Sequence, residues 1–455
     1  MGPWKTAIPA GLVLMFSTAV LLAPVSNTSA GMALIRVRDD AQLAAAVAAL
    51  RDSGGTIVLA RGDFDGKLLV PARSTRPLRI VGEPGARVER ILLEDTQRVT
   101  LGPITIAPRT QDARLEVRGS NHVVVHDVVV RATGTRYSAS VLVSSSRHVT
   151  IRQSVFTHCG DRSLAWSNCL QMKNSSRSIL VEDNWFHDCY GCDFIHGRFH
   201  ANLVIRGNRF QAALPCRFKT DRCRHQDLVQ LFAGRNLVVE RNVFGTHRGG
   251  AAQLYLTGAI DRARIVDNVF AATDPRVPGY RVRVGLVIGR GRTGRLPSDV
   301  RVLGNTIVSG VRRADGYAGS IRMSSRYGGV PLTDRPILAN NVIGLLEVRK
   351  HVCSAVRRSV SNVVLHGQRC SSSDRVGPAH LDRHCRPTAA SKLLIDRAAP
   401  RYARATDFAR RPRGTAPDIG AFEYVAARSN SDRTAGRSAK VPSSLFGRQR
   451  AFGCR

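Results

Sequence analysis

The chain has 455 residues, of which 43% are hydrophobic, and its formal net charge at pH 7 is +34. Beyond the first 30 residues no apolar stretch is long enough to cross a bilayer, which excludes a helical integral membrane protein. The charge comes almost entirely from Arg and is spread along the chain. It therefore either forms a field that attracts polyanions or reflects solvated side chains between structural repeats.

Residues 1–30 are expected to be a secretory signal peptide. Lys5 supplies the positive start, Ala10 to Val25 is apolar, and small residues precede a cleavage site after Ala30. We therefore expect a secreted, extracellular protein without membrane insertion. This location also argues against a nucleic-acid partner for the basic chain.

Residues 31–424 are expected to form one domain that begins with a capping helix. An acidic pair, Asp39 and Asp40, suits a helix start, and Leu43, Val47 and Leu50 then share one helical face. A helix at this place would cover the open end of a solenoid, where apolar side chains and unpaired backbone are otherwise exposed.

A short motif recurs through the middle of the chain. Each copy has a β-branched run, two polar residues, a key residue that is usually Asn, one variable residue and an aromatic or aliphatic residue. Three copies end in Asn184-Trp-Phe186, Asn208-Arg-Phe210 and Asn242-Val-Phe244. The key positions are 127, 154, 184, 208, 242, 268, 305 and 341, which lie 24 to 37 residues apart.

A repeat this short cannot bury its own apolar face, so the copies must stack. The pattern predicts an all-β fold, a parallel β-helix in which each copy is one coil and the longer intervals contain loops. A β-sandwich is the alternative, but sandwiches do not place Asn and Phe at one recurring offset. Residues 425–455 are basic, rich in Ser and Arg, and without periodicity, and we expect them to be disordered.

The ten cysteines suit an oxidising compartment. Cys159 and Cys189 each follow a motif Phe by three residues, so their stacking predicts a disulfide. The same register brings Cys169 near Cys192. Cys216 and Cys223 are expected to close a loop, whereas the pairing of Cys353, Cys370, Cys385 and Cys454 stays open. A zinc site is the alternative, although Cys189-x-x-Cys192 is the one pair with ligand spacing.

The opening Asp40-Ala-Gln-Leu43, the Asn-x-Phe coils and the closing Pro417-Asp-Ile-Gly-Ala-Phe-Glu-Tyr424 resemble secreted bacterial right-handed parallel β-helix proteins of the pectin-lyase-like superfamily. The resemblance covers roughly residues 34 to 424. It implies a right-handed parallel β-helix, most often a monomer that acts on polysaccharides. Because this superfamily holds lyases, hydrolases, epimerases and adhesins, the fold alone does not choose among them.

In a β-helix, catalytic groups come from neighbouring coils. Counting back from the key Asn of each coil predicts that Asp193 and Asp227 stack, with Gln253 next, over coils 165 to 260. Polar residues there take positions that structural strands fill with Val or Ile. We expect the substrate-binding residues to be Gln171, Asp193, Gln230, Gln253 and Tyr255, and the catalytic candidates to be Lys173, His196, Arg198, His225 and Asp227.

A lyase of uronic-acid polysaccharides needs a base and a cationic group beside the sugar carboxylate. The segment Gln171-Met-Lys173 and the following Ile195-His196-Gly197 are similar to the alginate lyase/chondroitinase B family, which implies that Lys173 is the base. The acid position falls on His196 in the counted register, with Arg198 displaced by two. The alternative for Lys173 is an ordinary solvated side chain.

Two further activities stay open. A hydrolase of the polygalacturonase type would use Asp193 and Asp227 as its carboxylate pair. A binding protein would hold anionic glycans through its Arg side chains without catalysis. No cofactor is required by the sequence, although His225, Asp227 and Gln230 lie within six residues and their Asp and Gln oxygens would suit Ca²⁺. The alternative for Asp227 is a turn cap.

Overall fold

The computed structural model of the protein describes residues 33–70, 76–107, 114–131, 139–159, 168–190, 193–211, 227–245, 252–271, 284–291, 294–309, 319–346, 352–426 and Cys454. The chain divides into Met1–Met32 and Ala33–Arg455, and all described residues belong to the second unit. The expected signal peptide lies outside the described residues. No helix within them is long and apolar enough to span a membrane.

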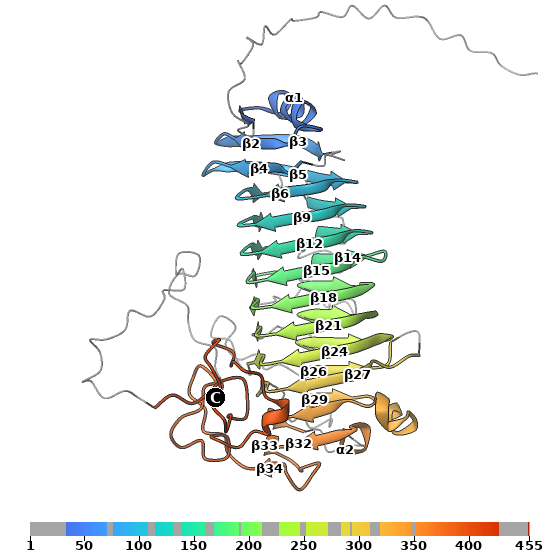
Figure 1. Ribbon diagram of the computed structural model, residues 1–455, viewed down its shortest axis with the longest axis vertical. Coiled ribbons are helices and arrows are strands. Elements are labelled where there is room, and N and C mark those ends of the chain that lie inside the picture. The colour runs from blue at the N-terminus through green and yellow to red at the C-terminus, as the bar shows by residue number, and fades with distance from the viewer. Residues whose placement is uncertain are drawn as a thin grey trace, which may run out of the picture. The chain divides into compact units, whose positions relative to one another are not determined.

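The predicted capping helix is present as α1 (Asp40–Leu50). Asp39 is its N-cap, and the Asp39 side chain accepts a hydrogen bond of 2.8 Å from the Gln42 backbone N–H. The face formed by Leu43, Ala46, Val47 and Leu50 is buried in the main core, so the helix closes one end of the column of strands (Figure 1).

Parallel strands stacked in register form a first sheet (Figure 1). Within the described residues its order is β1 (Leu34–Val37), β2 (Gly55–Leu59), β4 (Leu78–Gly82), β6 (Gln97–Leu101), β9 (Asn121–His126), β12 (Arg147–Arg152), β15 (Arg177–Glu182), β18 (Ala201–Arg206), β21 (Gly234–Glu240), β24 (Ile260–Val266), β27 (Ser298–Leu303), β30 (Ile337–Ala339) and β32 (Arg358–Val360).

After the first-sheet strand, each coil turns into a short strand. These stack as β7 (Thr105–Ile106), β10 (Val129–Arg131), β13 (Val155–Thr157), β16 (Trp185–His187), β19 (Arg209–Gln211), β22 (Val243–Phe244), β25 (Val269–Phe270), β28 (Thr306–Ile307), β31 (Val342–Leu345), β33 (Val363–His366) and β34 (Arg375–Val376).

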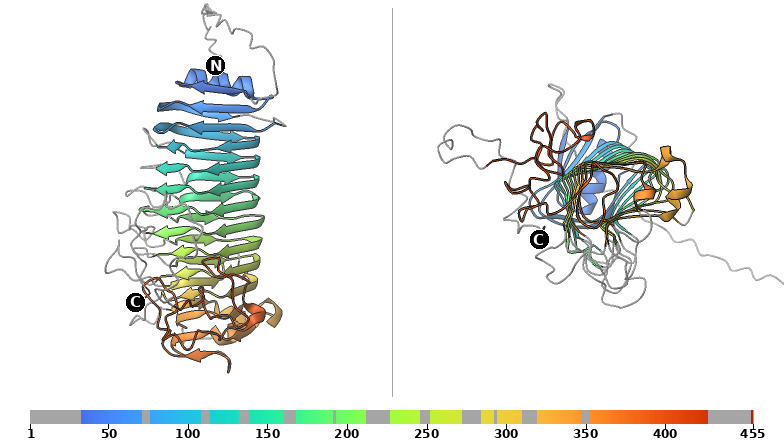
Figure 2. Two further views of the ribbon diagram at one scale, coloured as in Figure 1. Left: turned by 60° about the vertical axis from the view of Figure 1, so that its left-hand side comes forward. Right: turned by 90° about the horizontal axis from the view of Figure 1, so that it is seen from below.

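A third set of strands completes the coils. It contains β3 (Gly62–Val70), β5 (Ala86–Glu94), β8 (Arg114–Arg118), β11 (Ala139–Ser144), β14 (Asn168–Lys173), β17 (Ile195–Gly197), β20 (Val229–Leu231), β23 (Leu254–Thr257), β26 (Val284–Gly289) and β29 (Gly319–Met323). Viewed from below, the strands of successive coils lie over one another (Figure 2). The prediction of a parallel β-helix is confirmed.

A ladder of buried amides runs along the corner between the first-sheet strands and the short strands. The backbone N–H of Asn184 donates to Asn208 Oδ1 at 3.0 Å, and the N–H of Asn208 donates to Asn242 Oδ1 at 2.9 Å. Each side-chain N–H₂ also donates to the next Asn Oδ1 and to a backbone carbonyl of the preceding coil. The ladder continues through Asn268, Asn305, Asn341 and Asn362 to Asp374.

The aromatic residue of the motif forms a second ladder inside the column. Phe156, Phe186, Phe210, Phe244 and Phe270 stack with ring centroids 4.4 to 5.1 Å apart. One key position was wrong: Val128, not Asp127, lies on the rung of Ser154, whose Oγ accepts from the Val128 N–H. Asp127 instead occupies the left-handed corner position before the ladder, with φ 54°, as Asp183 does at φ 53°.

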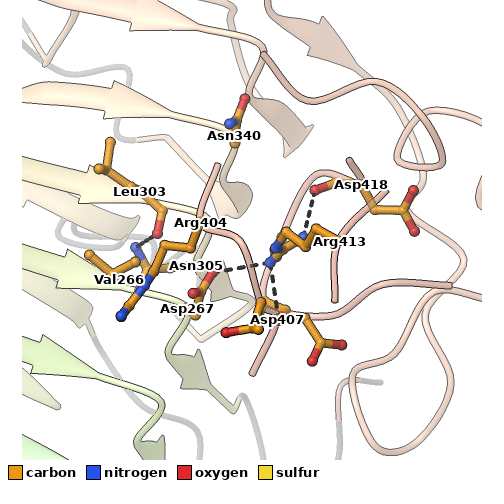
Figure 3. Close-up of polar contacts among 12 residues, drawn as sticks. Val266, Asp267, Leu303, Asn305, Asn340, Arg404, Asp407, Arg413 and Asp418 are labelled. Atoms are coloured by element: carbon orange, nitrogen blue, oxygen red, sulfur yellow. Dashed lines mark hydrogen bonds and ion pairs between the residues drawn. The ribbon is translucent and has the colours of Figure 1, made fainter. Parts of the chain in front are cut away.

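Beyond the last coils, the C-terminal segment folds back along the corner of the asparagine ladder. The Arg413 side chain, which is 3% exposed, donates to Asp267 Oδ1 at 3.1 Å (Figure 3). It also donates to Glu423 Oε1 at 2.8 Å. Arg404 also bonds to Glu240, and the N–H of Gly420 donates to the Asn340 carbonyl at 2.8 Å. Burial raises the pKa of Asp267 to about 7, and Arg413 acts in the opposite direction.

The described cysteines include two disulfides, Cys353–Cys370 and Cys385–Cys454. The second attaches the one described residue of the C-terminal tail to the preceding segment; the rest of the expected disordered region after Ala426 lies outside the described residues. Cys159, Cys169 and Cys189 are buried with their sulfurs all within 4.8 Å, and Cys169 Sγ lies 2.8 Å from Cys189 Sγ. The Cys159–Cys189 disulfide stays a prediction, and Cys192, Cys216 and Cys223 lie outside the described residues.

We predict that Asn242→Ala destabilises the fold by about 2–5 kcal/mol, because buried groups of Asn208, Ile205 and Asn268 lose their partners. Chemical denaturation monitored by circular dichroism measures the loss. The exposed Arg264→Ala on the adjacent strand is the control and should change stability by less than about 0.5 kcal/mol. Equal stability of the two variants would contradict a structural role for the ladder.

We also predict that Arg413→Met destabilises the protein more at pH 8 than at pH 5. The pKa of Asp267 is higher in the folded state than in the unfolded state. Its contribution to the free energy of unfolding therefore falls as pH rises from about 4 through about 7. Removing the guanidinium leaves a buried carboxylate without its cation. Thermal unfolding at both pH values tests this, with exposed Arg397→Met as the control; a loss independent of pH would contradict it.

Candidate functional site

The outward face of the third set of strands is polar over four successive coils. Gln171 pairs in register with His196, His196 with Gln230, and Gln230 with Tyr255. Their neighbours in each strand, such as Leu170, Ile195 and Val229, point into the core. This ladder of Gln171, His196, Gln230 and Tyr255 will be called the polar ladder. Alternation along a strand directs all four side chains away from the core, with Gln171 7% and Gln230 8% exposed.

The next outward position places two cationic residues on adjacent rungs. Ser144 pairs with Lys173, and the pairing of Met172 with Gly197 puts Arg198 on the rung that follows Lys173. The Arg198 N–H donates to the Met172 carbonyl at 3.2 Å, which continues the same register. The counted register, which had aligned Lys173 with His196, was therefore wrong: His196 pairs with Gln171, and Arg198 is the neighbour of Lys173.

His196 is held by a carboxylate. Its Nδ1 lies 2.7 Å from Asp193 Oδ2, and its ring meets Phe232 edge-on with centroids 4.8 Å apart. The His196 side chain is 18% exposed and Asp193 only 8%. Asp193 thus fixes the imidazole from behind, so that the other ring nitrogen is directed away from the carboxylate.

Asp227 lies one coil further and is fully buried. Its backbone N–H donates to Asp193 Oδ1 at 2.8 Å, and its Oδ1 accepts from the Ala252 N–H at 2.7 Å. Burial, followed by the neighbouring Asp193, raises the pKa of Asp227 well above its usual range. The predicted stacking of Asp193 and Asp227 is present. Both oxygens of Asp193 are already engaged, by His196 Nδ1 and by the Asp227 N–H, and Asp227 is fully buried.

Gln253 is also fully buried. Its Nε2 donates to the carbonyls of Phe244, Gly245 and Ala271, at 2.6 to 3.0 Å. The register aligns Ala252, not Gln253, with Asp227. The expected place of Gln253 beside the two aspartates was therefore wrong, and its contacts are those of a residue that joins turns of neighbouring coils.

Tyr255 ends the polar ladder, and the sequence reading missed a cation near it. Val287 and then Arg322 follow Tyr255 in register. Burial and the carboxyl of Asp227 raise the pKa of the Tyr255 hydroxyl, whereas Arg322 acts in the opposite direction. Arg322 follows residues 310–318, which lie outside the described residues. Counting along the sequence gave no signal for it, whereas the strand register does.

The remaining candidates concern metals and loops. His225 lies outside the described residues. Within the described part of the chain, the group of three potential metal ligands is Cys159, Cys169 and Cys189, not a set of carboxylates. Asp227 Oδ1 already accepts a hydrogen bond from the Ala252 N–H. The described residues therefore add no support to the expected calcium binding through Asp227 and Gln230. A groove lined partly by Asn174 and Ser175 begins where β14 ends.

Comparison with known proteins agrees with this fold. A family model described as the right handed beta helix region matches residues 113–307. Those residues form a right-handed β-helix. The fold expected from the pectin-lyase-like resemblance is thereby confirmed. No curated protein sequence matches the chain.

Solved structures with similar folds share little sequence with it. Pectate lyase Pel9A is 17% identical, over 84% of this chain and 90% of its own, with a TM-score of 0.45. An alginate lyase from Paenibacillus sp. str. FPU-7 is 12% identical, over 59% and 98%, with a TM-score of 0.41. The surface adhesin PfbA of Streptococcus pneumoniae is 12% identical, over 67% and 87%, with a TM-score of 0.36.

We predict that Asp227→Asn leaves stability near that of the wild type at pH 6, whereas Asp227→Ala lowers it by about 1–3 kcal/mol. The raised pKa favours a neutral carboxyl, which an amide replaces while Oδ1 still accepts from the Ala252 N–H. Urea unfolding of both variants measures the difference. A large loss in Asp227→Asn would show that the charge of this carboxyl is required.

Proposed function

We propose that the protein is an extracellular polysaccharide lyase that cleaves a uronic-acid polysaccharide by β-elimination. The observation that carries the proposal is the pair of cations on adjacent rungs, Lys173 and Arg198, beside the polar ladder. Within the described residues, neither side chain forms an ion pair with a carboxylate. The two cations are therefore available to an anionic ligand on this face.

The reaction breaks the C–H bond beside the sugar carboxylate and the bond from the adjacent ring carbon to the glycosidic oxygen. The electron pair of the C–H bond becomes the new carbon–carbon double bond, and the leaving oxygen takes up a proton. A base must accept the first proton, and a cation must stabilise the negative charge that develops on the carboxylate. We assign Lys173 as the base, and Arg198 as the group that neutralises the carboxylate.

The polar ladder supplies the remaining groups. Asp193 holds His196 at Nδ1, so the other ring nitrogen faces the surface that carries Arg198. His196 and Arg198 are successive outward residues of the same coil, with Gly197 between them. The Tyr255 hydroxyl can donate or accept a hydrogen bond. We assign His196 to proton delivery to the leaving oxygen, and Gln171, Gln230 and Tyr255 to hydrogen bonds with sugar hydroxyls.

The hydrolase alternative is less well supported by the site. A glycosidase needs two carboxyl groups that flank the scissile bond. Asp193 is nearly buried and Asp227 fully buried, and both already accept hydrogen bonds from the protein. A binding protein without catalysis stays the second candidate, because an adhesin is among the proteins of similar fold and the cations alone would hold an anionic chain.

We predict that the purified protein generates unsaturated uronides from at least one of alginate, pectate, chondroitin and hyaluronan. Their ultraviolet absorbance reports β-elimination directly. Lys173→Ala should lower the rate about 100-fold or more, because it removes the proposed base. New reducing ends without absorbance would indicate a hydrolase, and retention of the polymer without either would indicate a binding protein.

The matched control is Lys392→Ala. Lys392 is exposed and lies in the C-terminal segment, far along the chain from the polar ladder. The Lys392→Ala substitution removes the same charge as Lys173→Ala, in a protein in which Lys is scarce. Wild-type activity in Lys173→Ala would remove this residue from the mechanism, and equal losses in both variants would indicate a general charge effect.

A further inference from the structure

A groove of about 510 Å³ crosses several coils at the corner between the third set of strands and the first sheet. At this corner, the stacked residues Asp95, Gly119, Ser145 and Asn174 have left-handed backbone, with φ from 50° to 57°. Buried Ser120 and Ser146 form its floor and are joined by a hydrogen bond of 3.1 Å from the Ser120 N–H to Ser146 Oγ. The groove is therefore built by the repeat and follows the direction of stacking.

Cationic side chains line one wall of this groove. Arg147 and Arg177 are paired in register on adjacent rungs, and exposed His200 lies beside the next rung. Among the described residues, no ion pair engages Arg147, Arg177 or His200. The single carboxylate that lines the groove is Asp95. Two arginines on adjacent strands repel one another unless an anion lies between them.

The neighbouring imidazoles report the same positive field. His122 and His148 stack on adjacent rungs with centroids 4.6 Å apart. Burial lowers the pKa of His148, and His122, Arg147 and Arg177 lower it further. The groove wall is thus positive at the rungs of Arg147 and Arg177.

We infer that this corner groove binds a carboxylate-bearing stretch of a glycan chain, with Arg147 and Arg177 each engaging one sugar carboxylate. Planar guanidinium groups match the geometry of a carboxylate. Asn121, Asn174 and Ser175 supply donors and acceptors for sugar hydroxyls. The assignment of the ligand as an acidic polysaccharide rests on the proposed function. The position of the groove is an observation of the structure and is independent of that proposal.

The groove and the polar ladder are continuous along the chain. Asn174 and Ser175, which line the groove, follow Lys173 directly, and Asn174 Nδ2 donates to Ser144 Oγ at 3.0 Å. Ser144 and Lys173 are themselves paired in register. A chain bound across Lys173 therefore meets the groove at the end of β14, so the groove extends the contact surface for substrate beyond the reacting sugar.

The test is affinity electrophoresis through gels that contain pectate, alginate, chondroitin sulfate or neutral dextran. We expect pectate or alginate to retard the wild type. The double variant Arg147→Gln/Arg177→Gln should bind about tenfold more weakly, since two charge-assisted contacts are lost. The control Arg264→Gln/Arg301→Gln changes the same charge at two arginines that also pair in register on the first sheet, outside the groove, and should bind like the wild type.

Each result decides the inference. Equal weakening in both double variants would show a diffuse charge effect and overturn it, and so would unchanged binding in Arg147→Gln/Arg177→Gln. Retention by neutral dextran as strong as that by pectate or alginate would overturn the assignment to carboxylates. Binding is measured without turnover, so a protein that produces no unsaturated uronides but loses pectate binding in this variant supports the groove while the lyase proposal fails.

Discussion

The buried asparagine ladder is the constraint on which the rest of the structure depends. A parallel strand pair can slip by one residue, and that slip would exchange inward and outward side chains. Each ladder Asn bonds to the backbone N–H of the coil before it and to the carbonyl of an earlier strand, so a slipped coil would bury unsatisfied amides. The same register that stacks Asn184, Asn208 and Asn242 therefore also places His196 beside Gln171 and Arg198 after Lys173.

Buried charge is used in two different ways along the column. Near the last coils, Arg413 joins Asp267 and Glu423 and attaches the C-terminal segment to the corner of the ladder. Near the polar ladder, Asp193 bonds to His196, and burial raises the pKa of Asp227. One arrangement fixes chain segments to each other, and the other leaves one carboxylate, Asp193, to orient a histidine at the surface.

The sequence was sufficient for the fold because recurring Asn and Phe residues mark one corner of each coil, and that corner varies little. The site was harder to predict because the third set of strands, which carries it, is separated from the ladder Asn by the corner that leads into the first sheet. Lys173 precedes Asn184 by eleven residues, whereas Arg198 precedes Asn208 by ten. The additional residue is taken up at Asn174 and Ser175, which both adopt left-handed backbone with φ 50° and 59°. This additional residue accounts for one of the two positions by which the counted register missed Arg198, and a similar one-residue shift misaligned Gln253.

This additional corner residue also connects the proposed base to the proposed binding groove. Left-handed Asn174 and Ser175 end β14 directly after Lys173 and line the groove that Arg147 and Arg177 border. In a chain whose positive charge is almost all Arg, a lysine differs in kind, because an ammonium group can lose its proton at accessible pH whereas a guanidinium cannot. In the proposed function, Arg147 and Arg177 therefore stay charged and hold the anionic chain, whereas Lys173, which lies between them and the polar ladder, can accept a proton.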